Sequence, residues 1–272
     1  MIKVQLIRRQ AEPLRVEVQV PWGPCDQCEG AFMSPAAESR NGYKNKILAS
    51  LPKAEISRLG PHLSPVDLPA GKTLMDPGQE ITFVYFLETG LASVVVAMAN
   101  GSMVETGITG NDGLVGFPVL LGTKTTPTRT FMQIPGNGFK IKAHHLIEEF
   151  ERSGTLHKKI NRYFQAHLVQ TGQTAACNRL HDIAERLARW LLMCHDRMEA
   201  DHFTITHEFL GHMLGTPRST VTLAAGILHK SGLIAYSRGK LVVRDRKGLE
   251  KAACECYHTI RKEFDRLGIA AV

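Results

Sequence analysis

The stretch that decides the fold is ITHEFLGHMLGTPRSTV, residues 205–221. Its first half has the apolar periodicity of a short helix with one buried face, formed by Phe209, Leu210, Met213 and Leu214. Thr206 precedes these residues, where a hydroxyl can cap the free backbone N–H groups of the first turn. Gly215 follows them and predicts a sharp stop, because a helix often ends on a residue that tolerates positive φ.

A second helix is predicted directly after this turn. Thr216 can cap it, and Pro217 fits its first turn without losing a needed hydrogen bond. The 3.6-residue period buries Val221, Ala224, Ala225 and Leu228 and leaves Arg218, Ser219 and Thr222 exposed at the start of the helix. Two short helices joined by a glycine turn form a helix-turn-helix, whose second helix presents its N-terminal residues to base edges in the major groove of DNA.

A basic hairpin follows the two helices. Residues 234–236 and 241–243 are predicted strands, and Arg238-Gly239-Lys240 lies between them. Such a wing can lie along phosphates, while Arg218 can donate two hydrogen bonds to a guanine edge. The alternative is an ordinary helical hairpin packed in a core, but cap, turn, exposed arginine and basic wing occur here in the expected order.

Upstream, the pattern changes twice. Short strands with frequent glycines fill residues 65–142, with a predicted two-residue hairpin turn at Asn100-Gly101, and they indicate a β-sandwich, barrel or jelly roll. A long helix then carries one thin apolar stripe: Leu156, Ile160, Tyr163, His167, Thr171, Thr174 and Asn178. We expect this stripe to pack against a second copy of the chain, as a coiled-coil seam does. The alternative is packing on the chain's own β domain.

The remaining features limit the class of protein. The formal charge of +7 favours a polyanionic partner, and the absence of a long apolar run or signal peptide predicts a cytoplasmic protein that does not enter a membrane. Residues 1–42 look poorly ordered, and translation from Met33 is an alternative start.

Six cysteines in a chain of 272 residues do not suggest a disulfide framework.

We expect no metal and no cofactor. Cys25 and Cys28 form a lone CxxC pair, whereas an iron–sulfur cluster needs four ligands. Cys177, Cys254 and Cys256 are interpreted as packed thiols, with redox sensitivity as the alternative. The motifs GxSxG, P-loop, HExxH and GxGxxG after a strand do not occur, so an enzyme is not expected.

These residues resemble the Crp–Fnr family, which includes the cyclic-AMP receptor protein and the Fnr oxygen regulator. The similarity covers about residues 45–247 and is most specific from Ile205-Thr206 to Val221. It implies an α+β fold: an N-terminal cyclic-nucleotide-binding-type β jelly roll, a long central dimerisation helix and a C-terminal winged helix-turn-helix. The implied segments are an extension (1–42), a β-roll domain (43–154), a dimerisation helix (155–178), a winged helix-turn-helix (179–250) and a C-terminal helix (251–272).

The ligand site of the family is matched only in part. Cyclic-nucleotide-binding members hold the ribose with a glutamate just after a glycine, but Phe117 and Pro118 follow Gly116 here. Arg129-Thr130 resembles the phosphate-binding pair, and Thr171 on the long helix can face the pocket. A ribose without its acceptor would lose roughly 1–3 kcal/mol. We therefore expect that the β-roll does not hold cyclic AMP through the family's usual contacts.

The resemblance implies a homodimeric, sequence-specific transcription regulator that binds double-stranded DNA and contacts RNA polymerase, with an unknown small-molecule effector or none. The expected DNA-binding residues are Thr206, Thr216, Arg218, Ser219, Thr220, Thr222, Leu223, Arg238 and Lys240. The expected effector pocket consists of Gly116, Phe117, Arg129, Thr130 and Thr171. Two alternatives are a regulator that does respond to a cyclic nucleotide, and an effector-binding module with an accessory winged helix.

Overall fold

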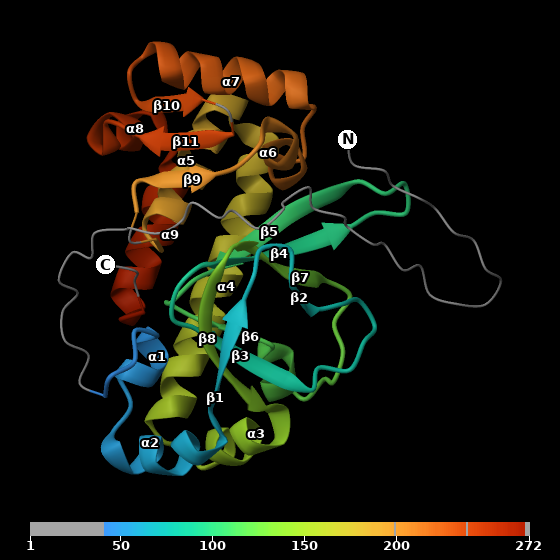
Figure 1. The fold of residues 1–272 in the computed structure, drawn as a ribbon, viewed down its shortest axis with the longest axis vertical. Helices are drawn as coiled ribbons and strands as arrows, with labels where there is room; N and C mark the ends of the chain where they lie inside the picture. Colours follow the sequence, from blue (N-terminus) through green and yellow to red (C-terminus); the bar gives the residue numbers. More distant parts are fainter. Residues whose placement is uncertain (1–40, 199, 238, 270–272) are drawn as a thin grey trace.

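The computed structural model describes residues 41–198, 200–237 and 239–269. A β-roll and a small α/β domain lie at opposite ends of one long helix, and the C-terminal helix runs beside that long helix (Figure 1). This is the α+β architecture that the sequence predicts, so the predicted fold class is confirmed. The expected N-terminal extension and its CxxC pair lie almost entirely outside the described residues.

The β-roll consists of two four-stranded antiparallel sheets. One sheet has the order β1 (Ser64–Leu68), β8 (Gly136–Lys142), β3 (Phe83–Leu87) and β6 (Leu114–Val115). The other has the order β2 (Thr73–Met75), β7 (Arg129–Ile134), β4 (Leu91–Ala97) and β5 (Met103–Thr109). Side chains that alternate along the strands, such as Val84 and Phe86, fill the core between the sheets.

The turn between β4 and β5 differs from its prediction. Residues 98–102 connect the strands, and of the two predicted turn residues Gly101 alone has a positive φ, +83°. Asn100 instead accepts hydrogen bonds from Ser102 through its side-chain oxygen. The hairpin is therefore where the sequence places it, with a longer loop than two residues, because the asparagine is used as a side-chain acceptor and not for left-handed backbone.

Short helices cover the β-roll at the end away from the small domain (Figure 1). They are α1 (Lys46–Ala49), α2 (Lys53–Leu59), the 3₁₀ turns η1 (Gly60–His62) and η2 (Phe117–Leu121), and α3 (Ala143–Glu151). The side chain of Asn45 accepts from the first N–H groups of α1. The carboxylate of Glu55 accepts from Thr155 N and Leu156 N, and so satisfies the N-terminus of the long helix.

The long helix α4 (Thr155–Leu180, 26 residues) packs its predicted stripe within its own chain. Leu156, Ile160, Tyr163 and Thr174 are buried although no second copy is present. These four residues therefore pack within the chain: Tyr163 contacts Thr109 of β5, and Thr174 contacts Arg189 of α5. Self-association through the long helix stays a prediction. The period of a sequence shows that a helix face is covered, but it does not show by which chain.

The small domain contains the helix-turn-helix and a three-stranded sheet. Its elements are α5 (Ile183–His195), β9 (His202–Thr204), α6 (His207–Leu214), α7 (Arg218–Lys230), β10 (Ile234–Ser237), β11 (Lys240–Val243) and α8 (Arg246–Ala252). A capping box between Asp182 and Glu185 starts α5 directly after α4 ends. The last helix, α9 (Glu255–Leu267), packs against α4.

Two buried polar contacts join the small domain to the β-roll. Trp190 of α5 donates a 2.7 Å hydrogen bond to Glu105 of β5, and Arg197, just after α5, forms a 2.7 Å ion pair with Asp112. Both charged side chains of the ion pair are at most 4% exposed. Among the described residues, no helix is both long enough and apolar enough to span a bilayer.

Candidate functional site

Helix α6 begins and ends as its sequence predicts. Thr206 is the N-cap, and its hydroxyl accepts from Phe209 N at 3.1 Å. Leu210, Met213 and Leu214 are buried. Gly215 ends the helix in the left-handed conformation, with φ +59°, which permits the abrupt turn into the next helix. The Thr206 cap and the Gly215 turn fix where α6 begins and ends, and α6 packs against α7.

Helix α7 starts with its N-terminus free. The predicted cap by Thr216 does not form: Pro217 occupies the N-cap position, and no side chain caps the helix. The prediction was wrong because the preset φ of proline, −57° here, is sufficient to begin the helix. The buried face is the predicted one, with Val221, Ala224, Ala225 and Leu228. The unsatisfied N–H groups leave a partial positive charge at this helix end.

The exposed face of α7 presents both polar and apolar groups. Arg218 and Ser219 are exposed at its first turn, while Thr220 is half-buried. Leu223 is 72% exposed and Ile227, one turn later, is 56% exposed. Sequence analysis identified Leu223 and missed Ile227, although the four-residue spacing would have placed both on one face. An exposed apolar pair is unusual on a helix whose other face is already buried.

Thr222 is held inside the motif. Its hydroxyl donates to Arg218 O and lies 3.0 Å from His207 Nδ1. The imidazole of His207 stacks on Tyr236 of β10, with ring centroids 4.2 Å apart. Burial, and secondly the charge of Arg218, lower the pKa of His207, so the ring is neutral near pH 7. His207 and Tyr236 were not predicted as site residues, because their contact joins parts of the chain that only folding brings together.

The wing is fixed to the start of α6. β11 pairs with both β10 and β9, and Ile205 N donates to Gly239 O at 2.7 Å. Tyr236 also donates its hydroxyl hydrogen to Ile205 O. Lys240 is exposed at the start of β11, whereas Arg238 lies outside the described residues. The wing and the two helices therefore form one packed body with Arg218, Ser219 and Lys240 on its surface.

The structure places the predicted effector-pocket residues in different surroundings, and their common pocket stays a prediction. Arg129 lines an open hollow between β2, β3 and β7, and its guanidinium is 2.6 Å from the carboxylate of Asp76. Gly116, Phe117, Thr130 and Thr171 are not among the residues that line it. The hydroxyl of Thr130 is buried and has no hydrogen-bond partner among the described residues.

Phe117, which follows Gly116 in the chain, packs between the β-roll and α4. Gly116 adopts φ +102° and starts η2, and the Phe117 ring packs against α4. Its centroid is 5.3 Å from that of Phe164 and 5.2 Å from that of His167. Burial lowers the pKa of His167 to about 4, so this ring is neutral as well. The position is thus part of an apolar contact between the β-roll and α4.

A second face of α4 is exposed and carries small and apolar residues. Leu168 is 68% exposed, Gly172 has open space where a Cβ would stand, and Ala175 and Ala176 are exposed. Small residues allow the backbones of two helices to approach closely. This face differs from the stripe that the sequence predicts as the seam.

Comparison with known proteins supports this description. Residues 185–252 match the family model of the Crp-like helix-turn-helix domain. The transcriptional regulator LdrP of Thermus thermophilus is 24% identical over 191 residues, which are 67% of this chain and 93% of LdrP.

Solved structures have the same fold. FixK2 from Bradyrhizobium japonicum has 16% identity and a TM-score of 0.61, over 71% of this chain and 98% of FixK2. A crp/fnr-family regulator from Eubacterium rectale also has 16% identity, with a TM-score of 0.60 over 74% and 94% of the two chains. LdrP and the protein from Eubacterium rectale are named as transcriptional regulators. The chain accordingly contains a Crp-like helix-turn-helix domain, and its fold is similar to that of solved regulators of the Crp–Fnr family.

Proposed function

We propose that the protein acts as a homodimer that reads a two-fold symmetric DNA site through the N-terminal half of α7. The observation that carries this proposal is the exposed Arg218 and Ser219 at the free N-terminus of α7, on one packed body with the wing. Arg218 donates two hydrogen bonds to a guanine edge, and Leu223 and Ile227 contact thymine methyl groups. Ser219, Thr216, Thr220 and the wing residues Arg238 and Lys240 contact phosphates or neighbouring base edges. Thr206 and Thr222 orient the motif.

The proposed dimer seam is the exposed face of α4. Leu168 supplies apolar area, and Gly172, Ala175 and Ala176 permit a close crossing of two α4 helices. A parallel pair of α4 helices presents two α7 helices about one turn of DNA apart, which is the geometry that a palindromic site requires. Contact with RNA polymerase and a cytoplasmic location follow as part of this proposal.

The proposed signal is not cyclic AMP held through the family's usual contacts. Phe117 offers no acceptor for a ribose hydroxyl pair and packs on α4. A signal that moves η2 or α4 changes the small domain through Trp190–Glu105 and Arg197–Asp112. One observation favours the alternative of a cyclic-nucleotide-responsive regulator: the buried Thr130 hydroxyl lacks a partner beside Arg129. A phosphate oxygen would be a suitable acceptor for it.

The test is selection of bound fragments from random duplex DNA with the full chain and no added ligand. A two-fold symmetric consensus, lost with Arg218→Ala, would support the proposal. Arg152→Ala is the matched control, because Arg152 is exposed at the far end of the β-roll. A consensus that appears only with cyclic AMP or cyclic GMP would favour the alternative. No enrichment in any arm would overturn sequence-specific DNA binding.

A further inference from the structure

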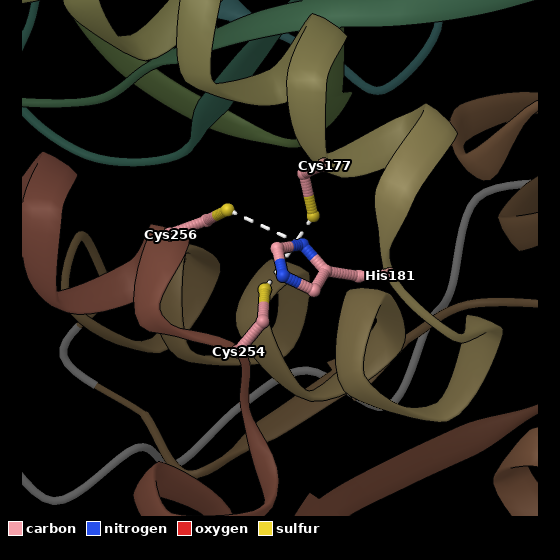
Figure 2. A group of neighbouring side chains, drawn as sticks. All are labelled: Cys177, His181, Cys254 and Cys256. Atoms are coloured by element: carbon pink, nitrogen blue, oxygen red, sulfur yellow. Dashed lines mark hydrogen bonds between the residues drawn. The ribbon is translucent and has the colours of Figure 1, made fainter.

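Three cysteines and one histidine from distant parts of the chain meet at the junction between α4 and α5. Cys177 lies in the last turn of α4, and His181 follows its end; Cys254 is the N-cap of α9, and Cys256 lies in its first turn (Figure 2). One ligand atom from each of the four residues lies within 4.8 Å of the others. The three cysteines are buried free thiols, and the histidine is partly exposed.

The four side chains converge in the way a tetrahedral metal site requires. Zn–S bonds of about 2.3 Å and Zn–N bonds of about 2.0 Å give a tetrahedron whose edges are about 3.8 Å between sulfurs and about 3.5 Å between sulfur and nitrogen. Cys177 Sγ and Cys254 Sγ are 3.5 Å apart, and Cys256 Sγ is 3.5 Å from His181 Nδ1 (Figure 2). These two edges are therefore close to the lengths that a shared ion would set, and all pairs lie within 4.8 Å. Three sulfurs and one imidazole nitrogen are also a usual ligand set for zinc.

The surroundings of the cluster match those of a metal centre. His181 turns Nδ1 to the sulfurs, while its other nitrogen, Nε2, is 3.1 Å from the carboxylate of Glu255. A carboxylate on the far nitrogen fixes the ring and its tautomer in many metal sites. Gln173 donates an N–H hydrogen bond to Cys256 Sγ at 3.2 Å, which stabilises a thiolate. Cysteines that only fill space in a core require neither a carboxylate on a neighbouring histidine nor a hydrogen bond to sulfur.

We propose that Cys177, His181, Cys254 and Cys256 bind one zinc ion. The three thiols lose their protons to solvent when the metal binds, and the histidine binds as the neutral ring through Nδ1. The ion joins the start of α9 to the end of α4, at the point where the DNA-binding domain begins. The inference does not depend on which DNA the protein reads.

The test is metal content and Co²⁺ spectroscopy on the full chain, purified under reducing conditions. We expect one zinc per chain, and we expect Co²⁺ to give the intense visible bands of a tetrahedral site with thiolate charge-transfer bands. Adding a mercurial reagent to the wild-type protein should release the metal as the thiols react. This measurement needs no variant and so cannot fail through misfolding.

Variants locate the metal. Cys177→Ser and Cys256→Ser should lose stoichiometric zinc, whereas Cys194→Ala, at a buried thiol outside the cluster, should keep it. The double variant Cys25→Ser/Cys28→Ser should also keep it. Glu255→Gln, at a side chain that is 74% exposed, should fold normally and bind zinc roughly 10–100-fold more weakly.

Several results would overturn the proposal. They are a reduced wild-type protein that binds neither Zn²⁺ nor Co²⁺, a Co²⁺ spectrum without thiolate bands, and loss of the metal only when Cys25 and Cys28 are replaced. A Cys177–Cys254 disulfide in a protein that takes up no metal after reduction would likewise overturn it. That outcome would assign the cluster to thiol oxidation instead.

Discussion

Glu105 ties the stability of the two-domain arrangement to pH. It is buried and accepts from Trp190 of the DNA-binding domain. Burial raises the pKa of Glu105 to about 7. Hydrogen bonds with Ser93 and Trp190 and the charges of Arg189 and Arg197 lower this pKa, but their effect is smaller than that of burial. In the unfolded chain the carboxyl titrates near 4.5. Between these values the folded state holds a proton that the unfolded state has lost, so the free energy of unfolding falls as the pH rises.

The magnitude follows from the two pKa values. The difference between 4.5 and about 7, at about 1.36 kcal/mol for each pH unit, corresponds to about 3 kcal/mol. This stabilisation is fully present below about pH 4.5 and is lost as the pH rises through about 7. In the variant Glu105→Gln the contribution disappears, because an amide does not titrate, while its oxygen still accepts from Trp190. We therefore compare the free energy of unfolding of the variant with that of the wild type at each pH. Between about pH 4.5 and about pH 8, the wild type should lose about 3 kcal/mol relative to the variant.

The assay is urea unfolding of both proteins at the two pH values, followed by circular dichroism. Other titrating groups contribute equally to wild type and variant, so they cancel in the comparison. Glu80→Gln, at an exposed glutamate, is the matched control and should show no such shift. Equal pH slopes for wild type and Glu105→Gln would refute the reasoning, since the buried carboxyl would then titrate alike in both states.

Four further substitutions test other parts of the structure. Arg218→Ala should cost roughly 1–3 kcal/mol on the preferred DNA and flatten sequence preference in binding titrations; an equal loss on all sequences would show that Arg218 touches only the backbone. Lys240→Ala should weaken binding on all sequences and lower the slope of log affinity against log salt by about 1; an unchanged slope would exclude a phosphate contact. Leu168→Glu should give monomers in analytical ultracentrifugation, and an unchanged dimer would refute the proposed seam. Asp112→Asn leaves the Arg197 charge buried, so unfolding should cost about 3–5 kcal/mol less; a stability within 1 kcal/mol of wild type, on the order of experimental scatter, would contradict this.

Local signals made the helix-turn-helix predictable. The Thr206 cap and the Gly215 turn depend on neighbours within a few residues, so the sequence shows them directly. The same holds for the buried face of α7, which follows from its period. The predicted cap by Thr216 was the exception. Thr216 and Pro217 are neighbours that can both occupy the N-cap position, and the structure places Pro217 there.

Contacts between distant segments could not be predicted. Cys177 and Cys254 are 77 residues apart, and nothing in the chain between them indicates that they meet. The predicted seam on α4 shows the same limit, because β5 of the same chain covers Tyr163 of that stripe. The effector pocket stays a prediction that rests on a family pattern: Phe117 packs on α4, and Arg129 lines a hollow between β2, β3 and β7.

The buried pair of Arg197 and Asp112 limits how the DNA-binding domain can move. Arg197 also stacks on the ring of Phe264 in α9 and donates to Gln170 of α4, so four segments meet at one guanidinium. Separating it from Asp112 would return two charges to water through an opened core. A rotation that keeps the pair together leaves the core closed, and we expect this route to be favoured. We therefore expect the DNA-binding domain to rotate about this guanidinium and not to move away from the β-roll.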